Sequence, residues 1–271
     1  MPSNSGSSAT SGALLKSSPW QINRRVIGAL LLRELLTRYG RNNIGFLWLF
    51  VEPTVFIIVL TVAWSTYRGG GGGLPIVAFA LTGYPSLLLW RSTASRCIGS
   101  VNSNKPLLFH KQVTITDIFL ARIFLELIAI SATMVALTAV FYAIGWLLLP
   151  EDALEVIAGW LLLCWFSAGL GLTVGGLSEK TQIVSKVWHP IQYLLMMVSG
   201  VAFMVDALPE HSQQLILWVP MMNAVEIIRE GWFGSQVQAH YDLEYLITFN
   251  VILTLVGLTL VRQIAFDSSE E

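Results

Sequence analysis

The sequence predicts an all-α integral membrane protein. It would have six transmembrane helices, an N-terminal amphipathic interface helix, and short external re-entrant helices between the fifth and sixth spans. Only 12% of its 271 residues are charged, whereas about 25% is usual in soluble domains. Hydrophobic residues make up 54% and gather in long runs, close to the roughly 20 residues that a spanning helix needs. The runs lack the alternating polarity of membrane β-strands.

The six predicted spans cover residues 44–67, 75–98, 121–149, 154–177, 183–205 and 243–264. Ser and Gly dominate residues 1–19, which we interpret as a disordered cytoplasmic tail, and residues 20–271 form one transmembrane domain. The glycine run Gly69–Gly73 predicts a flexible external loop. In the fourth span, the spacing of Gly171, Gly175 and Gly176 favours close helix packing.

Composition excludes several classes of protein. With a net charge of -1 and few charged residues, the chain has neither the surface of an ordinary soluble enzyme nor the basic face of a nucleic-acid binder. Cys97 and Cys164 are too few for a disulfide scaffold or a Cys-based zinc site. The four His are scattered, and the sequence lacks a phosphate-binding loop and a G-x-S-x-G elbow. We therefore expect no catalytic site and no metal or cofactor bound by this chain.

Orientation follows from the placement of basic residues, because cytoplasmic flanks are enriched in Lys and Arg. With six spans, all 16 Lys and Arg except Arg68 and Arg229 fall on one side. Both termini are thus predicted to be cytoplasmic. The opposite side holds the acids Glu151, Asp152, Glu155, Asp206, Glu210, Glu226, Glu230, Asp242 and Glu244.

Residues 20–41 predict an amphipathic helix at the cytoplasmic membrane surface. Apolar residues recur at helical spacing, and several Arg residues would face anionic lipid headgroups. Two roles stay open, a simple membrane anchor or a gate at a substrate entrance. In the loop 99–117, the apolar Leu107, Leu108 and Phe109 lie amid polar flanks, which suits a short helix presented to a cytoplasmic partner.

The external region 206–242 contains an apolar stretch, Leu215–Val225, that is too short to cross a membrane and is interrupted by Pro220. Such a length indicates a re-entrant or interfacial helix. The charged residues after it are tolerated near a membrane if they are paired or face a cavity. An external capping hairpin with a structural salt bridge is the alternative interpretation.

Charges inside the predicted spans are candidates for function. Arg91 and Arg96 lie toward the cytoplasmic end of the second span, where they either snorkel to the interface or face an anionic pathway. Glu52 lies within reach of the same interface and is a possible partner for one of them. Arg122 and Glu126 have the i,i+4 spacing of a pair within one helix.

Four stretches carry a resemblance to a known family. Arg33–Arg41 (RELLTRYGR) and Gly45–Pro53 (GFLWLFVEP) resemble the opening of the ABC-2 permeases of capsular polysaccharide exporters. Asn104–Asp117 and Asn223–Glu230 agree with that family in order and spacing. The resemblance covers about residues 20–266, and the glycine run and the Ser-rich tail lie outside its pattern.

The resemblance implies a homodimeric permease that works with two separate ABC ATPase subunits, which bind ATP and Mg. It implies export of a lipid-linked, anionic capsular polysaccharide across the bacterial inner membrane, among membrane lipids, with a polysaccharide co-polymerase and an outer-membrane channel. O-antigen or teichoic acid export is the nearest alternative. An ion-driven secondary transporter is less favoured, because the sequence shows no internal repeat. A non-transporting scaffold is a further alternative.

The resemblance also implies roles for particular residues. The substrate entrance would comprise Arg24, Arg25, Arg33, Arg38, Tyr39 and Arg41; the ATPase-coupling segment Asn104, Lys105, Leu108, Phe109, His110 and Lys111; and the external gate Asn223, Glu226, Arg229 and Glu230. The candidates for the translocation pathway come from the charged and aromatic residues of the apolar spans and not from the resemblance; they are Trp48, Glu52, Arg91 and Arg96.

Overall fold

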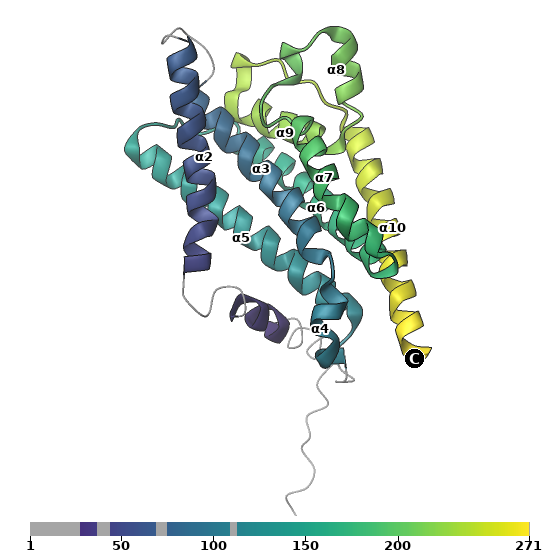
Figure 1. Ribbon diagram of the computed structural model, residues 1–271. Helices are drawn as coiled ribbons and strands as arrows, with labels where there is room; N and C mark the ends of the chain where they lie inside the picture. The colour runs from purple at the N-terminus through teal and green to yellow at the C-terminus, as the bar shows by residue number, and fades with distance from the viewer. Residues whose placement is uncertain (1–27, 37–43, 69–74, 109–112, 271) are drawn as a thin grey trace, which may run out of the picture.

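The computed structural model describes residues 28–36, 44–68, 75–108 and 113–270, and all regular structure in these ranges is helical (Figure 1). The predicted tail 1–19 and the glycine loop 69–73 lie outside the described residues. The helices are α2 (Ile44–Arg68), α3 (Ile76–Cys97), α4 (Ser100–Leu108), α5 (Ile115–Ile144), α6 (Ala153–Lys180), α7 (Gln182–Met197), α8 (Glu210–Ile216), α9 (Pro220–Phe233) and α10 (Leu243–Glu270), with 3-10 turns η1 (Val205–Ala207) and η2 (Gly234–Gln236) and a further helix at 28–36. The prediction of an all-α protein is confirmed.

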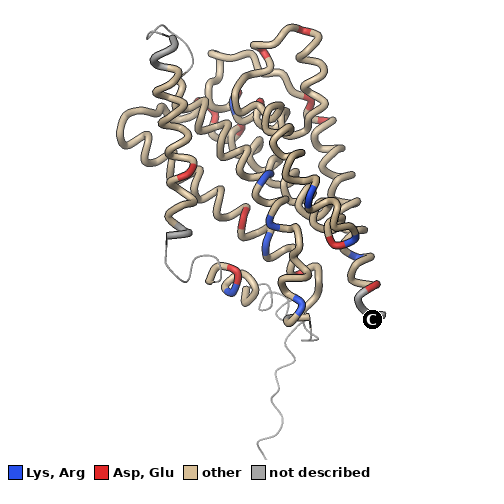
Figure 2. The backbone as a smooth tube through the Cα atoms, viewed as in Figure 1, with Lys and Arg blue, Asp and Glu red and all other residues tan. Residues whose placement is uncertain are grey.

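The long helices run between two ends of the bundle (Figure 1). The helix 28–36, α4 and the carboxyl end of α10 lie at one end, here called the α4 end. The opposite end, called the α8 end, holds α8 and the connections that flank α9. Figure 2 shows that Lys and Arg in the described residues gather in the half nearer the α4 end.

The core forms where α3 and α6 pack together and α5, α9 and α10 cover them. Close approach between α3 and α6 depends on small residues, as the sequence predicted. A Cβ atom on Gly175 would lie 2.7 Å from the Cβ of Cys97 and 2.5 Å from the ring of Phe119. Gly171 also faces Cys97, while Gly176 faces Leu260 of α10.

Within the described residues, 4 helices are long and apolar enough to cross a membrane, namely α2, α5, α6 and α10. α3 falls short in hydropathy because it lies in the protein interior, where its side chains contact other helices and include Arg91 and Arg96. α7 has only 16 residues, which at about 1.5 Å per residue is shorter than a hydrocarbon core of about 30 Å.

Three predicted boundaries differ from the structure. In the span predicted at 183–205, the helix ends at Met197, because the chain turns there and Gly200 lies in the left-handed region with a φ of 80°. α5 begins at Ile115 rather than at 121, because Thr114 and Asp117 form a capping box. The α5 helix ends at Ile144, before the predicted end of the span at 149, because Gly145 caps it with a φ of 81°.

The region predicted as re-entrant contains α8 and α9. Pro220 begins α9 instead of interrupting it, since proline is well tolerated in the first turn of a helix. Nearly every side chain of α9 is buried, against α6, α10 and α3. α9 therefore lies inside the bundle and is not an exposed hairpin on its surface.

Candidate functional site

A cavity of about 960 Å³ lies among the first turns of α2, the carboxyl-terminal half of α3, α5 and α7, and so lies toward the end of α3 that leads into α4. The residues that the sequence predicted for a translocation pathway, Trp48, Glu52, Arg91 and Arg96, all line it. We call it the arginine cavity. Its other lining residues are Leu49, Leu88, Ser92, Ser95, Ile130, His189, Gln192 and Tyr193.

Arg91 is held in the arginine cavity by α7. Its Nε donates a hydrogen bond to Oε1 of Gln192 at 3.3 Å, and its guanidinium lies 5.1 Å from the ring centroid of Tyr193. The same Gln192 oxygen accepts a hydrogen bond from the hydroxyl of Ser95 at 3.2 Å, and Nε2 of Gln192 lies 3.1 Å from Nδ1 of His189. Gln192 is only 4% exposed, so this network fixes α7 against α3.

Arg96 pairs with a carboxylate on α5. Its Nε lies 3.3 Å from Oε1 of Glu126, a residue that is 2% exposed, while the Arg96 side chain is 53% exposed. Arg122, one turn before Glu126, forms an ion pair with Glu34 of helix 28–36 at 3.3 Å. The i,i+4 spacing of Arg122 and Glu126 predicted a pair within α5. Instead, each of these residues forms an ion pair with a residue of another helix.

Glu52 and Trp48 bring α2 into the arginine cavity. Glu52 accepts a hydrogen bond from the hydroxyl of Tyr84 at 2.9 Å, whereas the sequence suggested an arginine as its partner. The ring of Tyr84 stacks on Phe56 with centroids 4.0 Å apart, which aligns α2 with α3. Trp48 is 60% exposed, so its ring presents an apolar face at the cavity wall.

Of the predicted entrance residues, the structure describes Arg33, whose Nη1 donates a hydrogen bond to Oδ1 of Asn104 at 3.0 Å. The other predicted entrance and coupling residues Arg24, Arg25, Arg38, Tyr39, Arg41, Phe109, His110 and Lys111 lie outside the described residues. In α4, Asn104 is buried, Lys105 is exposed, and Leu108 is partly buried against a cluster that includes Val101 and Ile115.

α4 is anchored to the carboxyl end of α6. Glu179 accepts hydrogen bonds from the backbone N–H of Val101 at 3.0 Å and from Nδ2 of Asn102 at 3.4 Å. A carboxylate at the amino end of a helix satisfies N–H groups that have no partner within the helix and favours the helix dipole. α4 therefore holds a defined position at its end of the bundle.

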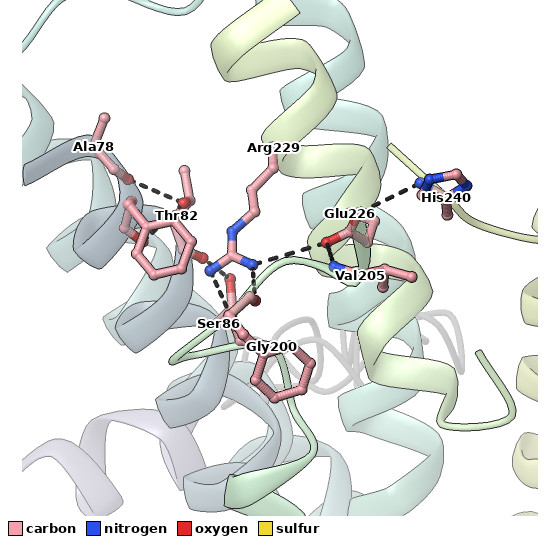
Figure 3. Close-up of polar contacts among 10 residues, drawn as sticks. Ala78, Thr82, Ser86, Gly200, Val205, Glu226, Arg229 and His240 are labelled. Atoms are coloured by element: carbon pink, nitrogen blue, oxygen red, sulfur yellow. Dashed lines mark hydrogen bonds and ion pairs between the residues drawn. The ribbon is translucent and has the colours of Figure 1, made fainter. Parts of the chain in front are cut away.

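Arg229, a predicted gate residue, is fully buried in α9 (Figure 3). It donates hydrogen bonds to the carbonyl oxygens of Gly200 at 2.5 Å and Phe203 at 2.7 Å. Its guanidinium lies 4.1 Å from the ring centroid of Phe79 and 3.9 Å from Oε1 of Glu226. Arg229 thereby binds the non-helical segment that follows α7.

The other predicted gate residues also hold connecting segments. Glu226 accepts hydrogen bonds from the backbone N–H groups of Val205 at 3.3 Å and His240 at 3.4 Å (Figure 3). Asn223 donates to the carbonyl oxygens of Leu217 and Val219 and accepts from the N–H of Asp242. A hydrogen bond to Glu230 raises the pKa of Tyr241 to about 12. These side chains fasten the connections around α9, and none of them lines the arginine cavity.

Sequence reasoning missed the α7 wall of the arginine cavity. His189, Gln192 and Tyr193 carry no motif, and the residues of α7 were assigned only to a span. A usable signal was the polar residues within this apolar helix, since a polar side chain in a membrane helix usually faces the protein interior.

The fold and the cavity define a helical membrane protein with an open, partly polar cavity that contains two arginines, and charged residues within membrane helices often mark the path of a polar solute. The profile of the ABC-2 type transporter family matches residues 25–233, and the chain belongs to this family.

The chain is similar to three named relatives along most of its length. The capsule polysaccharide export inner-membrane protein CtrC of Neisseria meningitidis serogroup B is 42% identical over 93% of this chain and 96% of the relative. A capsule polysaccharide export inner-membrane protein BexB of Haemophilus influenzae is 37% identical over 89% of this chain and 91% of its own. A polysialic acid transport protein KpsM of Escherichia coli is 25% identical over 90% of this chain and 95% of the relative.

Proposed function

We propose that the chain is the inner-membrane permease subunit of an ABC exporter of capsular polysaccharide, and that its arginine cavity binds the anionic, lipid-linked substrate. The observation that carries the proposal is the pairing of Arg91 and Arg96 in one cavity of a chain that is 42% identical to a capsule polysaccharide export protein. Arginine suits this task because its planar guanidinium forms paired hydrogen bonds with carboxylates and phosphates.

The chain crosses the membrane six times, with both termini in the cytoplasm. α3 forms the second crossing, since its burial among other helices removes the need for a wholly apolar surface. α7 and the segment 198–204 form the fifth, because irregular backbone is tolerated at membrane depth where protein groups satisfy it. Arg229 supplies such groups for Gly200 and Phe203. The basic α4 end supports the orientation (Figure 2).

The working transporter is a homodimer with two ABC ATPase subunits, which bind ATP and Mg. Membership of the ABC-2 family supports the ATPase partner. α4, with Lys105 exposed, is the segment that meets the ATPase at the cytoplasmic end. A polysaccharide co-polymerase and an outer-membrane channel would continue the route beyond the inner membrane.

ATP binding moves α4 and tilts the helix 28–36, which opens the arginine cavity toward the cytoplasm. An acidic group of the substrate binds Arg91 and Arg96, and the exposed face of Trp48 stacks against a sugar ring. The predicted external gate residues hold α9 and its connections in place at the exit, where α9 closes the path between transport cycles.

Replacing Arg91 and Arg96 together by Gln is expected to lower export at least tenfold, since two charge-assisted contacts with the substrate are lost, each contributing roughly 1.5–3 kcal/mol. Surface polysaccharide stained with Alcian blue, a cationic dye, measures export, and immunoblotting measures the amount of permease. Arg262→Gln, which removes the same charge from an exposed position on α10, is the control. Normal capsule in the double variant would show that these arginines only snorkel.

Gln192→Leu is expected to reduce export roughly tenfold, because Arg91 and Ser95 lose their shared acceptor. Gln192→Glu is expected to reduce export as well, since a carboxylate beside Arg91 competes with the anionic substrate. Gln214→Leu, at an exposed position of α8, is the matched control. The assay is the same Alcian blue staining, and export equal to wild type in both Gln192 variants would contradict this role.

Purification of the wild-type permease separates the proposal from its rivals. Copurification with an ATPase whose turnover depends on this chain is expected of an exporter, and its absence would favour a scaffold or an ion-driven transporter. Chemical analysis of the missing surface glycan in a deletion strain distinguishes capsule from O-antigen or teichoic acid.

A further inference from the structure

Arg122 of α5 contacts both α3 and the helix 28–36, which lie far apart in the sequence. From α5, its Nη1 donates a hydrogen bond to the backbone carbonyl of Arg96 at 2.8 Å, and its Nε lies 3.3 Å from Oε1 of Glu34. The Arg122 and Glu34 side chains are 14% and 30% exposed, so water and salt screen this pair less than an open surface pair.

The carbonyl of Arg96 belongs to the last turn of α3, where carbonyl groups have no partner within the helix. A cation at this end also interacts favourably with the helix dipole. The side chain of Arg96 is paired with Glu126, four residues after Arg122 on α5. α5 therefore holds both the backbone and the side chain of a residue that lines the arginine cavity.

The helix 28–36 makes a second contact one residue earlier. Arg33 donates a hydrogen bond to Asn104, a buried residue of α4 that also donates to the carbonyl of Ser100. Neighbouring residues of one short helix thus bind α4 on one side and Arg122 on the other. A displacement of α4 moves Arg33, and Glu34 moves with it because both belong to the same rigid helical turn.

From this geometry we infer that Arg122 is a positioning residue which links the movement of α4, through Arg33 and Glu34, to the placement of Arg96 in the arginine cavity. The inference rests on the proposed function and adds to it a physical connection between the ATPase-facing helix and the substrate site. While the Glu34–Arg122 pair is formed, Arg122 is held against the end of α3. When α4 withdraws the helix 28–36, Arg122 and the carbonyl of Arg96 move apart, and the cavity wall shifts.

The test compares Glu34→Gln, Arg122→Gln and the double variant with wild type and with the exposed control Arg262→Gln. Surface polysaccharide is measured with Alcian blue, and ATP hydrolysis is measured on the purified permease–ATPase complex in liposomes. Each single variant is expected to lower export about fivefold, which lies within the range by which side chains between two coupled sites change the coupling. The double variant is expected to match the singles, and hydrolysis to stay within about twofold of wild type.

Loss of export with retained hydrolysis is the result that a merely structural role would not produce. Three outcomes would overturn the inference. The first is normal export in both single variants. The second is a loss in the double variant equal to the product of the single losses, and the third is a parallel fall of hydrolysis and export. If Arg122→Gln fails to accumulate, Glu34→Gln and Glu34→Lys carry the test from the periphery of the bundle. Arg91→Gln in the same assay separates the two proposals. If this variant exports normally, substrate binding in the arginine cavity is contradicted, whereas the link from α4 through Arg122 to Arg96 is not.

Discussion

Replacement of Arg229 by Met is expected to lower the free energy of unfolding by roughly 3–5 kcal/mol, the usual cost of removing one member of a buried charged pair. The guanidinium is fully buried and binds the carbonyls of Gly200 and Phe203. Without it, both carbonyls lose a donor, and the carboxylate of Glu226 loses its cation in the protein interior.

Thermal unfolding of the purified permease in detergent, followed by tryptophan fluorescence, measures this effect. Arg229→Lys tests geometry against charge, because a single ammonium cannot replace the planar fork that reaches both carbonyls and lies over Phe79. It is expected to recover less than half of the lost stability. Arg262→Met, the same change at an exposed position, should alter stability by no more than about 0.5 kcal/mol. Equal midpoints for Arg229→Met and wild type would show that the segment after α7 does not depend on this side chain.

Gly231→Ala is expected to destabilise the protein by roughly 1–3 kcal/mol through overpacking. A Cβ atom at this position of α9 would lie 2.7 Å from the backbone nitrogen of Val156 and 2.8 Å from the carbonyl oxygen of Asp152. These are backbone atoms of the first turn of α6, which cannot rotate away as a side chain does. Residue 231 also accepts a hydrogen bond from the N–H of Asp152, so separating the helices would break that contact.

Gly171→Ala is the matched control for this experiment. Gly171 also lies within a helix, but its nearest neighbour would be the Sγ of Cys97 at 3.1 Å, a side-chain atom that can shift by a few tenths of an ångström. The gain in helix propensity, about 1 kcal/mol for Ala over Gly, offsets this crowding. The same fluorescence melt should therefore show a large loss for Gly231→Ala and little change for Gly171→Ala. Similar losses in both variants would mean that α9 can move away from α6.

Arg229, Glu226 and Asn223 illustrate how a motif and its structure differ. In the sequence they are polar residues that follow a short apolar stretch, and their spacing indicated either a gate or a salt-bridged hairpin. The structure places all three fully buried, with hydrogen bonds to connecting segments far from them in sequence. These side chains hold non-helical backbone in place beside α9.

Hydropathy and charge in the sequence by themselves determined the helical membrane class and the partition of basic and acidic residues, and they predicted segments 20–41, 99–117 and 206–242 as separate from the spans. These properties are local, because the membrane acts on each segment according to its own composition. The residues Trp48, Glu52, Arg91 and Arg96 were also found locally, as charged or aromatic residues in apolar spans.

Only the tertiary structure decided which side chains meet. Gln192 joins Arg91, Arg122 joins Glu34, and Arg229 joins Gly200, each across helices whose separation along the chain gives no sign of contact. The end of α7 at Met197 also depends on tertiary contacts, because Arg229 binds the carbonyl groups of the segment that follows. Such pairings depend on the rotation and height of packed helices, which are set by side-chain fit over the whole bundle and not by the polarity of any one segment.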